Sequence, residues 1–193
     1  MKKRLLVGLT GAVLLFSGCA MNNQPAPTNN ENQCVIDNTN APYWVCNPEV
    51  EGAIAAVGSA PYTPLGMSFQ RTEAAAAARD ALARQISVKV KNMFKQYQST
   101  TGVGDDMTVE KVAQNVSKQV ASVTLQNSKI MKVWSSKDKT LYVLVAVPKD
   151  TLVKKVKSAI KTTFKNDKAL WQEFKSKKAQ EELDREVEKE FNK

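Results

Sequence analysis

The chain has 193 residues, of which 42% are hydrophobic and 24% charged, and its formal net charge is +9. This composition is typical of one globular domain with tails and excludes a largely disordered chain. The sequence contains no histidine, which excludes Ser-His-Asp and Cys-His catalytic arrangements and removes the commonest general base, so we expect no enzyme.

The first residues form a secretory signal of the lipoprotein kind. The cations of Lys2–Arg4 precede an apolar run, Leu5–Phe16, and a small-residue site ending in Cys19 follows. This pattern predicts that residues 1–18 are a signal peptide and that Cys19 is acylated. A transmembrane or buried helix is the alternative, but the run is shorter than the roughly 20 apolar residues that span a bilayer. By the sorting rule known for lipoproteins, Ala20 after the cysteine favours the outer membrane.

Residues 19–40 are predicted to comprise the lipidated Cys19 and a flexible tether, because residues 20–33 carry almost no apolar surface. Once Cys19 is acylated, Cys34 and Cys46 remain as an even pair in an oxidising compartment, which predicts a disulfide. Two independent buried thiols are the alternative. Because there is no C-x-x-C spacing and no histidine, we expect neither a redox site nor a metal site, and no cofactor.

A domain over residues 41–165 is predicted to begin with a buried strand at residues 52–60, where small apolar residues end at Pro61. The small side chains imply that another element approaches this strand closely. A helix follows over residues 68–99 and is stopped by Gly102. Its apolar residues recur at steps of three and four, which places them on one stripe. The stripe consists of Ala78, Leu82, Ile86, Val90, Met93 and Tyr97.

A second helix is predicted to begin near Asp105, after which valines repeat at helical spacing. The period then changes to two over residues 129–134 and 141–147, which predicts a β-hairpin. Both faces of the second strand are apolar. We therefore expect helices on one of its faces and another element or another subunit on the other.

A third helix is predicted after Pro148, with an apolar stripe opposite a row of lysines. Such a helix either lies on a membrane or faces the core with a solvated lysine side, and the second arrangement is the more common. Residues 166–193 are predicted to form a charged, protruding helix whose apolar seam meets the body or a neighbouring copy; a frayed tail is the alternative. Candidate contacts to an anionic surface are Lys154, Lys157, Lys161 and Lys165.

Together these elements predict an α+β fold, with a small antiparallel sheet of about three strands packed against a long helix, in the order β-α-α-β-β-α, plus a C-terminal helical extension. The segments Ala41–Val45, Ala53–Ala60, Arg71–Ile86 and Leu141–Val145 resemble the Lpp-twenty outer-membrane lipoproteins, a family that includes the flagellar lipoprotein FlgP. The resemblance covers about residues 41–164. It implies a lipid-anchored α+β domain that assembles into rings or disks in the flagellar members, and it identifies no catalytic residue.

Two non-catalytic functions are consistent with these features. The first is a structural or assembly role in the envelope, in a flagellum-associated ring or disk, with further copies of the chain or envelope and flagellar proteins as partners. The second is a surface-exposed binding lipoprotein, either an adhesin or antigen or a binder of lipid or peptidoglycan. Without the signal the net charge is near +6, which suits anionic lipid, peptidoglycan or acidic proteins, while secretion excludes nucleic acid. Solubility alone is the alternative explanation of that charge.

Overall fold

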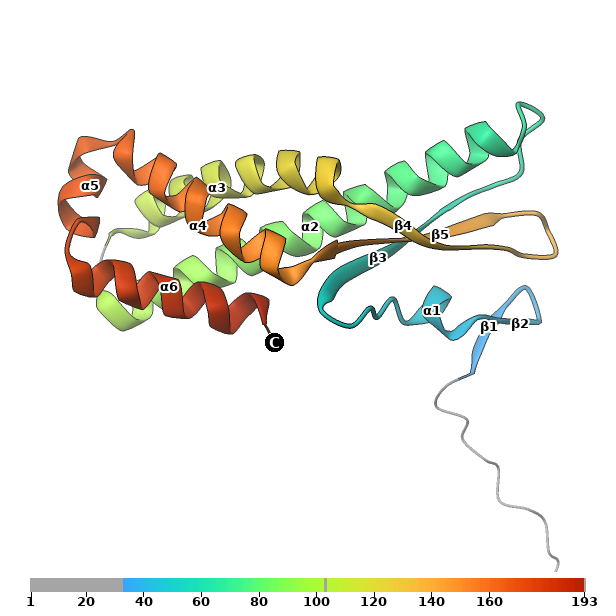
Figure 1. Cartoon of the computed structure of the whole chain (residues 1–193), viewed down its shortest axis with the longest axis horizontal. Coiled ribbons are helices and arrows are strands. Elements are labelled where there is room, and N and C mark those ends of the chain that lie inside the picture. Colours follow the sequence, from blue (N-terminus) through green and yellow to red (C-terminus); the bar gives the residue numbers. More distant parts are fainter. Residues whose placement is uncertain (1–32, 103, 193) are drawn as a thin grey trace, which may run out of the picture. The chain divides into compact units, whose positions relative to one another are not determined.

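A computed structural model describes residues 33–102 and 104–192 (Figure 1). The predicted signal peptide, residues 1–18, and the predicted acylation site, Cys19, lie outside these residues. In chain order the elements are β1 (Cys34–Ile36), β2 (Thr39–Ala41), α1 (Tyr43–Cys46), β3 (Ala53–Ala60), α2 (Met67–Thr101), α3 (Asp106–Asn127), β4 (Lys129–Ser135), β5 (Leu141–Pro148), α4 (Lys149–Lys165), α5 (Lys168–Phe174) and α6 (Lys177–Phe191).

The main sheet has three antiparallel strands in the order β3-β5-β4. The apolar strand β5 lies in the centre, where a strand with two apolar faces can be buried on both. From β3 to α4 the elements follow the predicted order β-α-α-β-β-α, so the α+β fold with a small antiparallel sheet and a long helix is confirmed. A separate two-stranded hairpin, β1-β2, and the short helix α1 precede the sheet and were not predicted.

Helix α2 packs on β3 and β5 with its first half. The predicted stripe from Ala78 to Tyr97 is buried throughout, so the predicted facing of this helix is confirmed. The helix ends at Gly102, which adopts the left-handed conformation with φ of 68° and donates its N–H to the carbonyl of Gln98. Glycine is the residue that takes this conformation without strain, which explains why the helix stops there.

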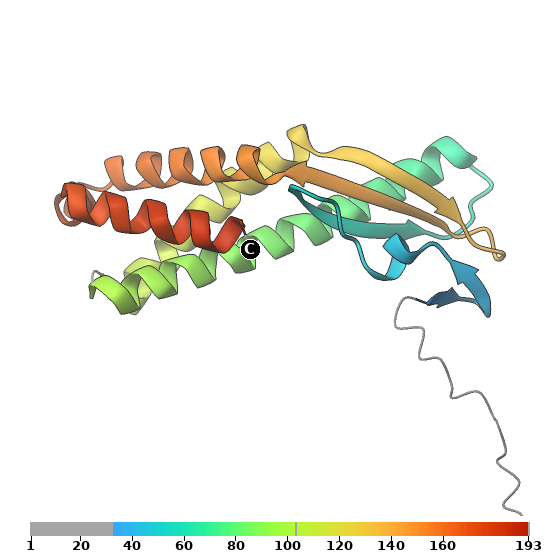
Figure 2. The ribbon, with the colours of Figure 1, turned by 60° about the horizontal axis from the view of Figure 1, so that its bottom comes forward.

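Four helices form a bundle beyond the sheet. Helix α2 contacts α3 and α6, α3 contacts α4, and α4 contacts α6, so the four surround a shared interior. Figures 1 and 2 show them side by side from two directions. The predicted start of α3 is confirmed, because the Asp105 carboxylate caps it by accepting a hydrogen bond from the N–H of Thr108 at 2.8 Å.

The C-terminal extension is helical, but it consists of two helices instead of the single one predicted. Ser176 begins α6 as a new helix, since its hydroxyl accepts a hydrogen bond from the N–H of Ala179 at 3.1 Å. Helix α5 packs through Phe174, whose ring stacks on Phe164 of α4 at 4.2 Å between centroids. The seam of α6 is buried against α2 and α4 of the same chain, so this extension neither protrudes nor frays.

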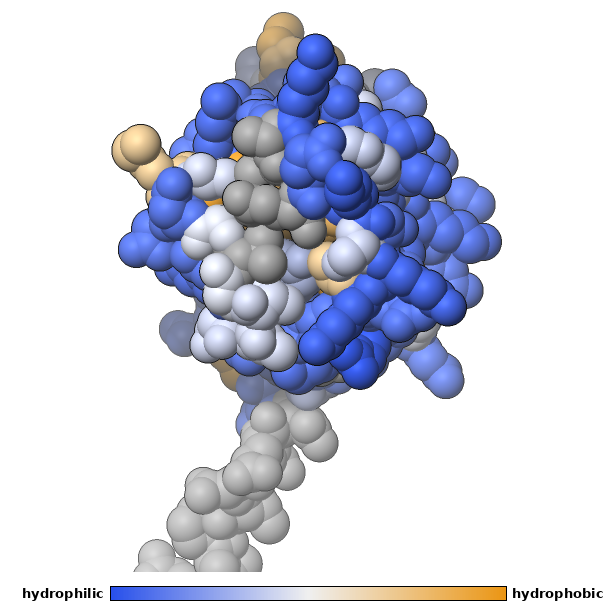
Figure 3. Space-filling view, turned by 90° about the vertical axis from the view of Figure 1, so that its left-hand side faces the viewer, coloured by the Kyte–Doolittle hydropathy of each residue, from blue (hydrophilic) through white to orange (hydrophobic). Residues whose placement is uncertain are grey.

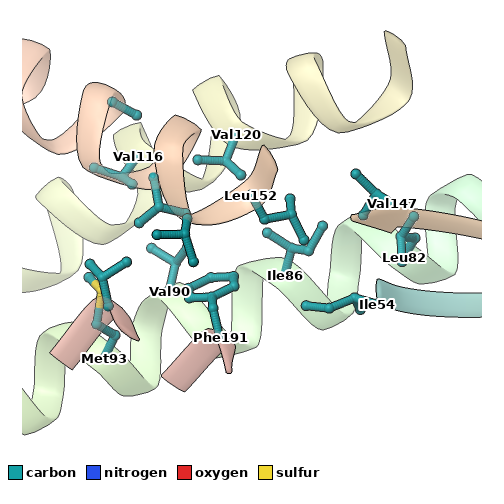
Figure 4. Close-up of a cluster of buried hydrophobic side chains, with 14 of the residues drawn as sticks. Ile54, Leu82, Ile86, Val90, Met93, Val116, Val120, Val147, Leu152 and Phe191 are labelled. Carbon is teal, nitrogen blue, oxygen red and sulfur yellow. The ribbon is translucent and has the colours of Figure 1, made fainter. Parts of the chain in front are cut away.

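One hydrophobic core runs from the sheet into the bundle. Figure 4 shows Ile54, Leu82 and Val147 near the sheet, while Phe191 of α6 enters among the side chains of the bundle. The predicted boundary after residue 165 therefore coincides with the end of α4 and does not mark an edge of the core. Removal of the extension would expose apolar side chains of α2 and α4 to water.

Candidate functional site

The chain enters the domain through a hairpin that a disulfide closes. Part of the segment predicted as a tether, residues 34–40, instead belongs to β1 and β2. Asp37 and Asn38 form the turn with φ values of 49° and 53°, the left-handed conformation that two-residue hairpin turns require and that Asp and Asn tolerate. The predicted disulfide is present between Cys34 and Cys46, whose Cα atoms are 5.7 Å apart.

The closed segment covers the second face of the main sheet. Leu144 and Ala146 of β5 are buried there together with Ala55 of β3, and Trp44 of α1 and Val50 pack against them. The second apolar face of β5 is therefore covered by an element of the same chain, which is one of the two predicted possibilities. Sequence reasoning identified the two cysteines but missed Trp44 as the contact that joins their loop to the sheet.

The turn between β4 and β5 lies against the hairpin and is ordered by Asp138. The Asp138 carboxylate accepts hydrogen bonds from the Ser136 hydroxyl and, at 2.7 Å and 3.1 Å, from the hydroxyl and N–H of Thr140. These donors lower the pKa of Asp138 to about 2. Burial raises the pKa of Tyr142, and the nearby carboxylates of Asp37 and Asp138 raise it further. The two turns are therefore close to each other.

An exposed apolar patch borders the same turn. From the sequence we predicted only a turn before the long helix at this place. The sequence does contain a sign of an apolar surface here, because residues Pro61 to Gln70 include no charged side chain. We call four exposed side chains in this run the tip patch. Its members, with their exposed fractions, are Tyr62 (60%), Leu65 (70%), Met67 (72%) and Phe69 (46%).

The predicted lysine row is solvent-exposed on α4, with one exception. Lys157 pairs with Glu188 of α6 at 2.9 Å and with Asp184 at 3.8 Å. The hydrogen bond to Glu188 raises the pKa of Lys157 and lowers that of Glu188. Lys154, Lys161 and Lys165 are exposed, and their contact with an anionic surface stays a prediction.

A cleft of about 370 Å³ opens between α4, α5 and α6. Trp171 and Phe174 line its apolar side, and Lys157 and Lys161 lie opposite Asp184. The end of the domain where α5 lies presents mainly hydrophilic residues to solvent (Figure 3). The cleft could therefore hold a small apolar group next to paired charges.

Two carboxylates that stand next to a second acidic residue in the sequence, Asp105 and Glu181, have structural partners. Asp105 caps α3, and the donation of the Thr108 N–H lowers its pKa. Glu181 pairs with Lys177, one turn earlier in α6. Among the described residues, no group of three or more His, Cys, Asp and Glu side chains could hold a metal ion. Within residues 33–102 and 104–192, no helix has both the length and the apolar character of a membrane span.

A small antiparallel sheet with a long helix on one face and a disulfide-closed segment on the other defines a small α+β domain. A structural disulfide of this kind is typical of proteins exported from the cytoplasm. Residues 42–148 match the family model of the LPP20 lipoprotein, and the chain therefore belongs to the LPP20 lipoprotein family. It is on this basis a lipoprotein associated with a membrane of the cell envelope. No match was found among curated proteins. The matched residues run from α1 to β5, so Cys34 and the helices α4 to α6 lie outside them.

Proposed function

We propose that this protein is an outer-membrane lipoprotein, held by an acylated Cys19, whose domain has a structural role in an assembly of the envelope such as a flagellum-associated ring or disk. The observation that carries the proposal is the disulfide that connects the chain leading to Cys19 to helix α1, which in turn packs on the sheet. Cys34 is bonded to Cys46 at the end of α1, and the neighbouring Trp44 packs on the central strands. A force on the anchor is thereby transmitted to the core and not only to the hairpin.

We also propose that the protein has no catalytic function. In support, three of its carboxylates serve as a helix cap at Asp105, as the centre of a turn at Asp138 and as an ion pair at Glu188. A catalytic group needs a partner that moves a proton or holds a substrate, and these groups are already engaged in holding the fold.

The structure also changes which surface would assemble. The second face of β5 and the seam of α6 are both covered within the chain, so neither is free for another copy. The edge strand β4 supports an assembly role better. In the described part of the chain both β3 and β4 pair only with β5, but β4 alone of these two edge strands exposes large hydrophobic side chains. Its Met131 and Val133 are 50% and 43% exposed. Exposed edge strands pair readily with strands of other chains.

A second candidate function is the binding of a small ligand, and the cleft beside α4 favours it. The wall formed by Trp171 and Phe174 next to Lys161 suits an apolar group that carries a negative charge. On this alternative the protein is a surface-exposed binding lipoprotein and acts as a monomer or small oligomer.

The size of the full-length lipidated protein, extracted in mild detergent, tests the assembly role. We expect a large complex for the wild type and its loss in Val133→Lys, which places a charge on the edge strand. Val88→Lys is the matched control, because Val88 is 56% exposed on α2, away from that edge. A monomeric wild type, or equal complexes in all three proteins, would contradict assembly through β4. A monomer that retains a ligand, lost in Trp171→Ala, would favour the second candidate.

A further inference from the structure

Exposed apolar side chains are concentrated at one place on the domain. Among the described residues, ten large hydrophobic side chains are exposed, and the four of the tip patch fall within residues 62–69. Scattered exposed apolar residues are ordinary on a soluble domain, whereas four of them within eight residues, two of which (Tyr62 and Phe69) line one shallow cavity, point to a contact surface. The exposure of these four side chains is therefore not explained by packing in the core.

The tip patch is held in place and does not depend on a flexible loop. The buried side chain of Gln70 donates hydrogen bonds to the carbonyls of Ala60 at 3.0 Å and of Lys139 at 2.7 Å. These bonds tie the start of α2 to the end of β3 and to the β4–β5 turn. A preformed surface loses little conformational entropy when it binds, so the four side chains are displayed ready for contact.

The chain that leads to Cys19 leaves the domain through the β1–β2 hairpin, which lies at the same end of the domain as the tip patch but on the other face of the sheet (Figure 1). The Lys139 ammonium lies 5.1 Å from the centre of the Tyr62 ring, and the neighbouring Asp138 lies near Asp37 in the β1–β2 turn. Cys34 is three residues from Asp37, about 10 Å along a strand. Figures 1 and 2 both show the two turns and the first turn of α2 at the same end of the domain.

The covalent length of the chain limits how far the anchor can be from this end. Fifteen residues separate Cys19 from Cys34, so the acylated sulfur lies at most about 50 Å away even when the chain is fully extended. Linkage over such a distance gives a high effective concentration of membrane at the end where the chain leaves the domain. The opposite end, where α5 lies, is mainly hydrophilic (Figure 3).

We propose that the tip patch is a second membrane contact, in which Leu65 and Met67 insert into the interfacial region of the lipid bilayer and Tyr62 lies at the headgroup level. The inference rests on the proposed acylation of Cys19. Tyrosine with an apolar ring and a polar hydroxyl favours the membrane interface, and leucine and methionine favour the acyl boundary. This contact would fix the orientation of the domain, which a single anchored point leaves free.

Charge contributes less than apolar burial to the proposed membrane contact of the tip patch. Three cations and two anions lie near the tip patch in α2 and the β4–β5 turn, so a net charge of only +1 attracts anionic lipid. The charged neighbours are Arg71, Glu73, Lys137, Asp138 and Lys139. At about 1 M salt the Debye length falls to about 3 Å, and a contact based on apolar burial should persist under these conditions.

The test uses the full-length lipidated chain with one reactive cysteine, since Cys34 and Cys46 are bonded and Cys19 is acylated. Met67→Cys and the control Met107→Cys are each labelled with a solvent-sensitive dye. The two methionines are 72% and 84% exposed. Met67 is the first residue of α2, whereas Met107 lies in the first turn of α3, which follows the other end of α2. Helix α2 is about 50 Å long. Each protein is reconstituted in phosphatidylethanolamine–phosphatidylglycerol vesicles, with and without a nitroxide-labelled lipid, and vesicle flotation is measured in parallel.

We expect a blue-shifted emission at position 67 and quenching by the nitroxide lipid about threefold stronger there than at position 107, also at high salt. Equal quenching at the two positions, in proteins that float with the vesicles, would overturn the tip-patch contact and leave the lipid anchor intact. A blue shift without nitroxide quenching would also overturn it, because the label would then contact protein. Proteins that do not float would contradict the anchor itself, and the tip-patch contact with it.

Discussion

Gly58 of β3 lies directly against the backbone of Ala78 in α2. A Cβ atom at position 58 would be 2.1 Å from the Ala78 nitrogen and 2.3 Å from the carbonyl oxygen of Ala74. No other residue type fits this position, since every other one carries a Cβ. The contact brings the longest helix close enough to the sheet for both to share one core, and the position of the tip patch at the start of that helix depends on this arrangement.

Substitution of Gly58 should therefore be costly. Gly58→Ala places a methyl group against backbone atoms that cannot rotate away, so we expect the free energy of unfolding to fall by about 2 kcal/mol or more. Chemical denaturation of the domain measures this. Ser59→Ala, at the next and exposed position of the strand, is the control and should change stability by less than about 0.5 kcal/mol. Similar values for the two variants would show that α2 can move away from β3.

Loss of the disulfide should destabilise the domain and loosen the segment over the second sheet face. For Cys46→Ser we expect a loss of about 3 kcal/mol, the value for closing a loop of this size, and greater protease sensitivity around Trp44. Thermal unfolding with and without reductant measures the effect. The double variant Cys34→Ser/Cys46→Ser should equal the single one, because both remove the same bond. A reductant-insensitive wild type would contradict the structural role of the bond.

The C-terminal extension should be required for stability. Phe191 is completely buried, so Phe191→Ala should lower the free energy of unfolding by about 3–5 kcal/mol. Glu181→Ala in the same helix is the control, since this exposed ion pair contributes less than about 0.5 kcal/mol. If Phe191→Ala unfolded like the wild type, α6 would not belong to the core.

Stability at acid pH should depend on Asp138. The pKa of its carboxyl is about 2 in the folded protein, against the usual 3.8. The ionised carboxylate therefore stabilises the fold fully above pH 3.8, and this contribution is lost as the pH falls through about 2. Asp138→Asn should therefore melt earlier than the wild type at neutral pH, with the difference shrinking between these two values. Thr140→Val, which removes a donor but no carboxylate, should weaken the same pH dependence. A melting difference independent of pH would contradict this account.

The lipid anchor predicts the location of the protein. Cys19→Ala should yield an unprocessed precursor or a protein lost from the outer-membrane fraction, since we propose that the lipid anchor is attached to Cys19. Fractionation of the native host with immunoblotting measures this. Cys46→Ser is a useful control, because it removes a cysteine but not the anchor. Retention of Cys19→Ala in the outer membrane would contradict the proposed attachment.

Periodicity in the sequence was sufficient for most of the fold. The stripe from Ala78 to Tyr97, the hairpin around residues 135–140 and the buried face of α4 follow from spacing alone, and the structure confirms them. The two extension helices could not be separated, because the break depends on the cap at Ser176. The tip patch was missed because periodicity indicates which residues can be buried and not which apolar ones stay exposed.

The amino-acid sequence by itself predicted the export and lipidation signal, and it determined the pair of cysteines left for a disulfide and most of the helices and strands, since each depends on residues that are close along the chain. Only the tertiary structure decided what covers the second face of β5, where the seam of α6 packs and which apolar side chains remain exposed. These outcomes depend on contacts between segments far apart in sequence, such as Trp44 with the central strands and Phe191 with the bundle, and local patterns do not specify such partners.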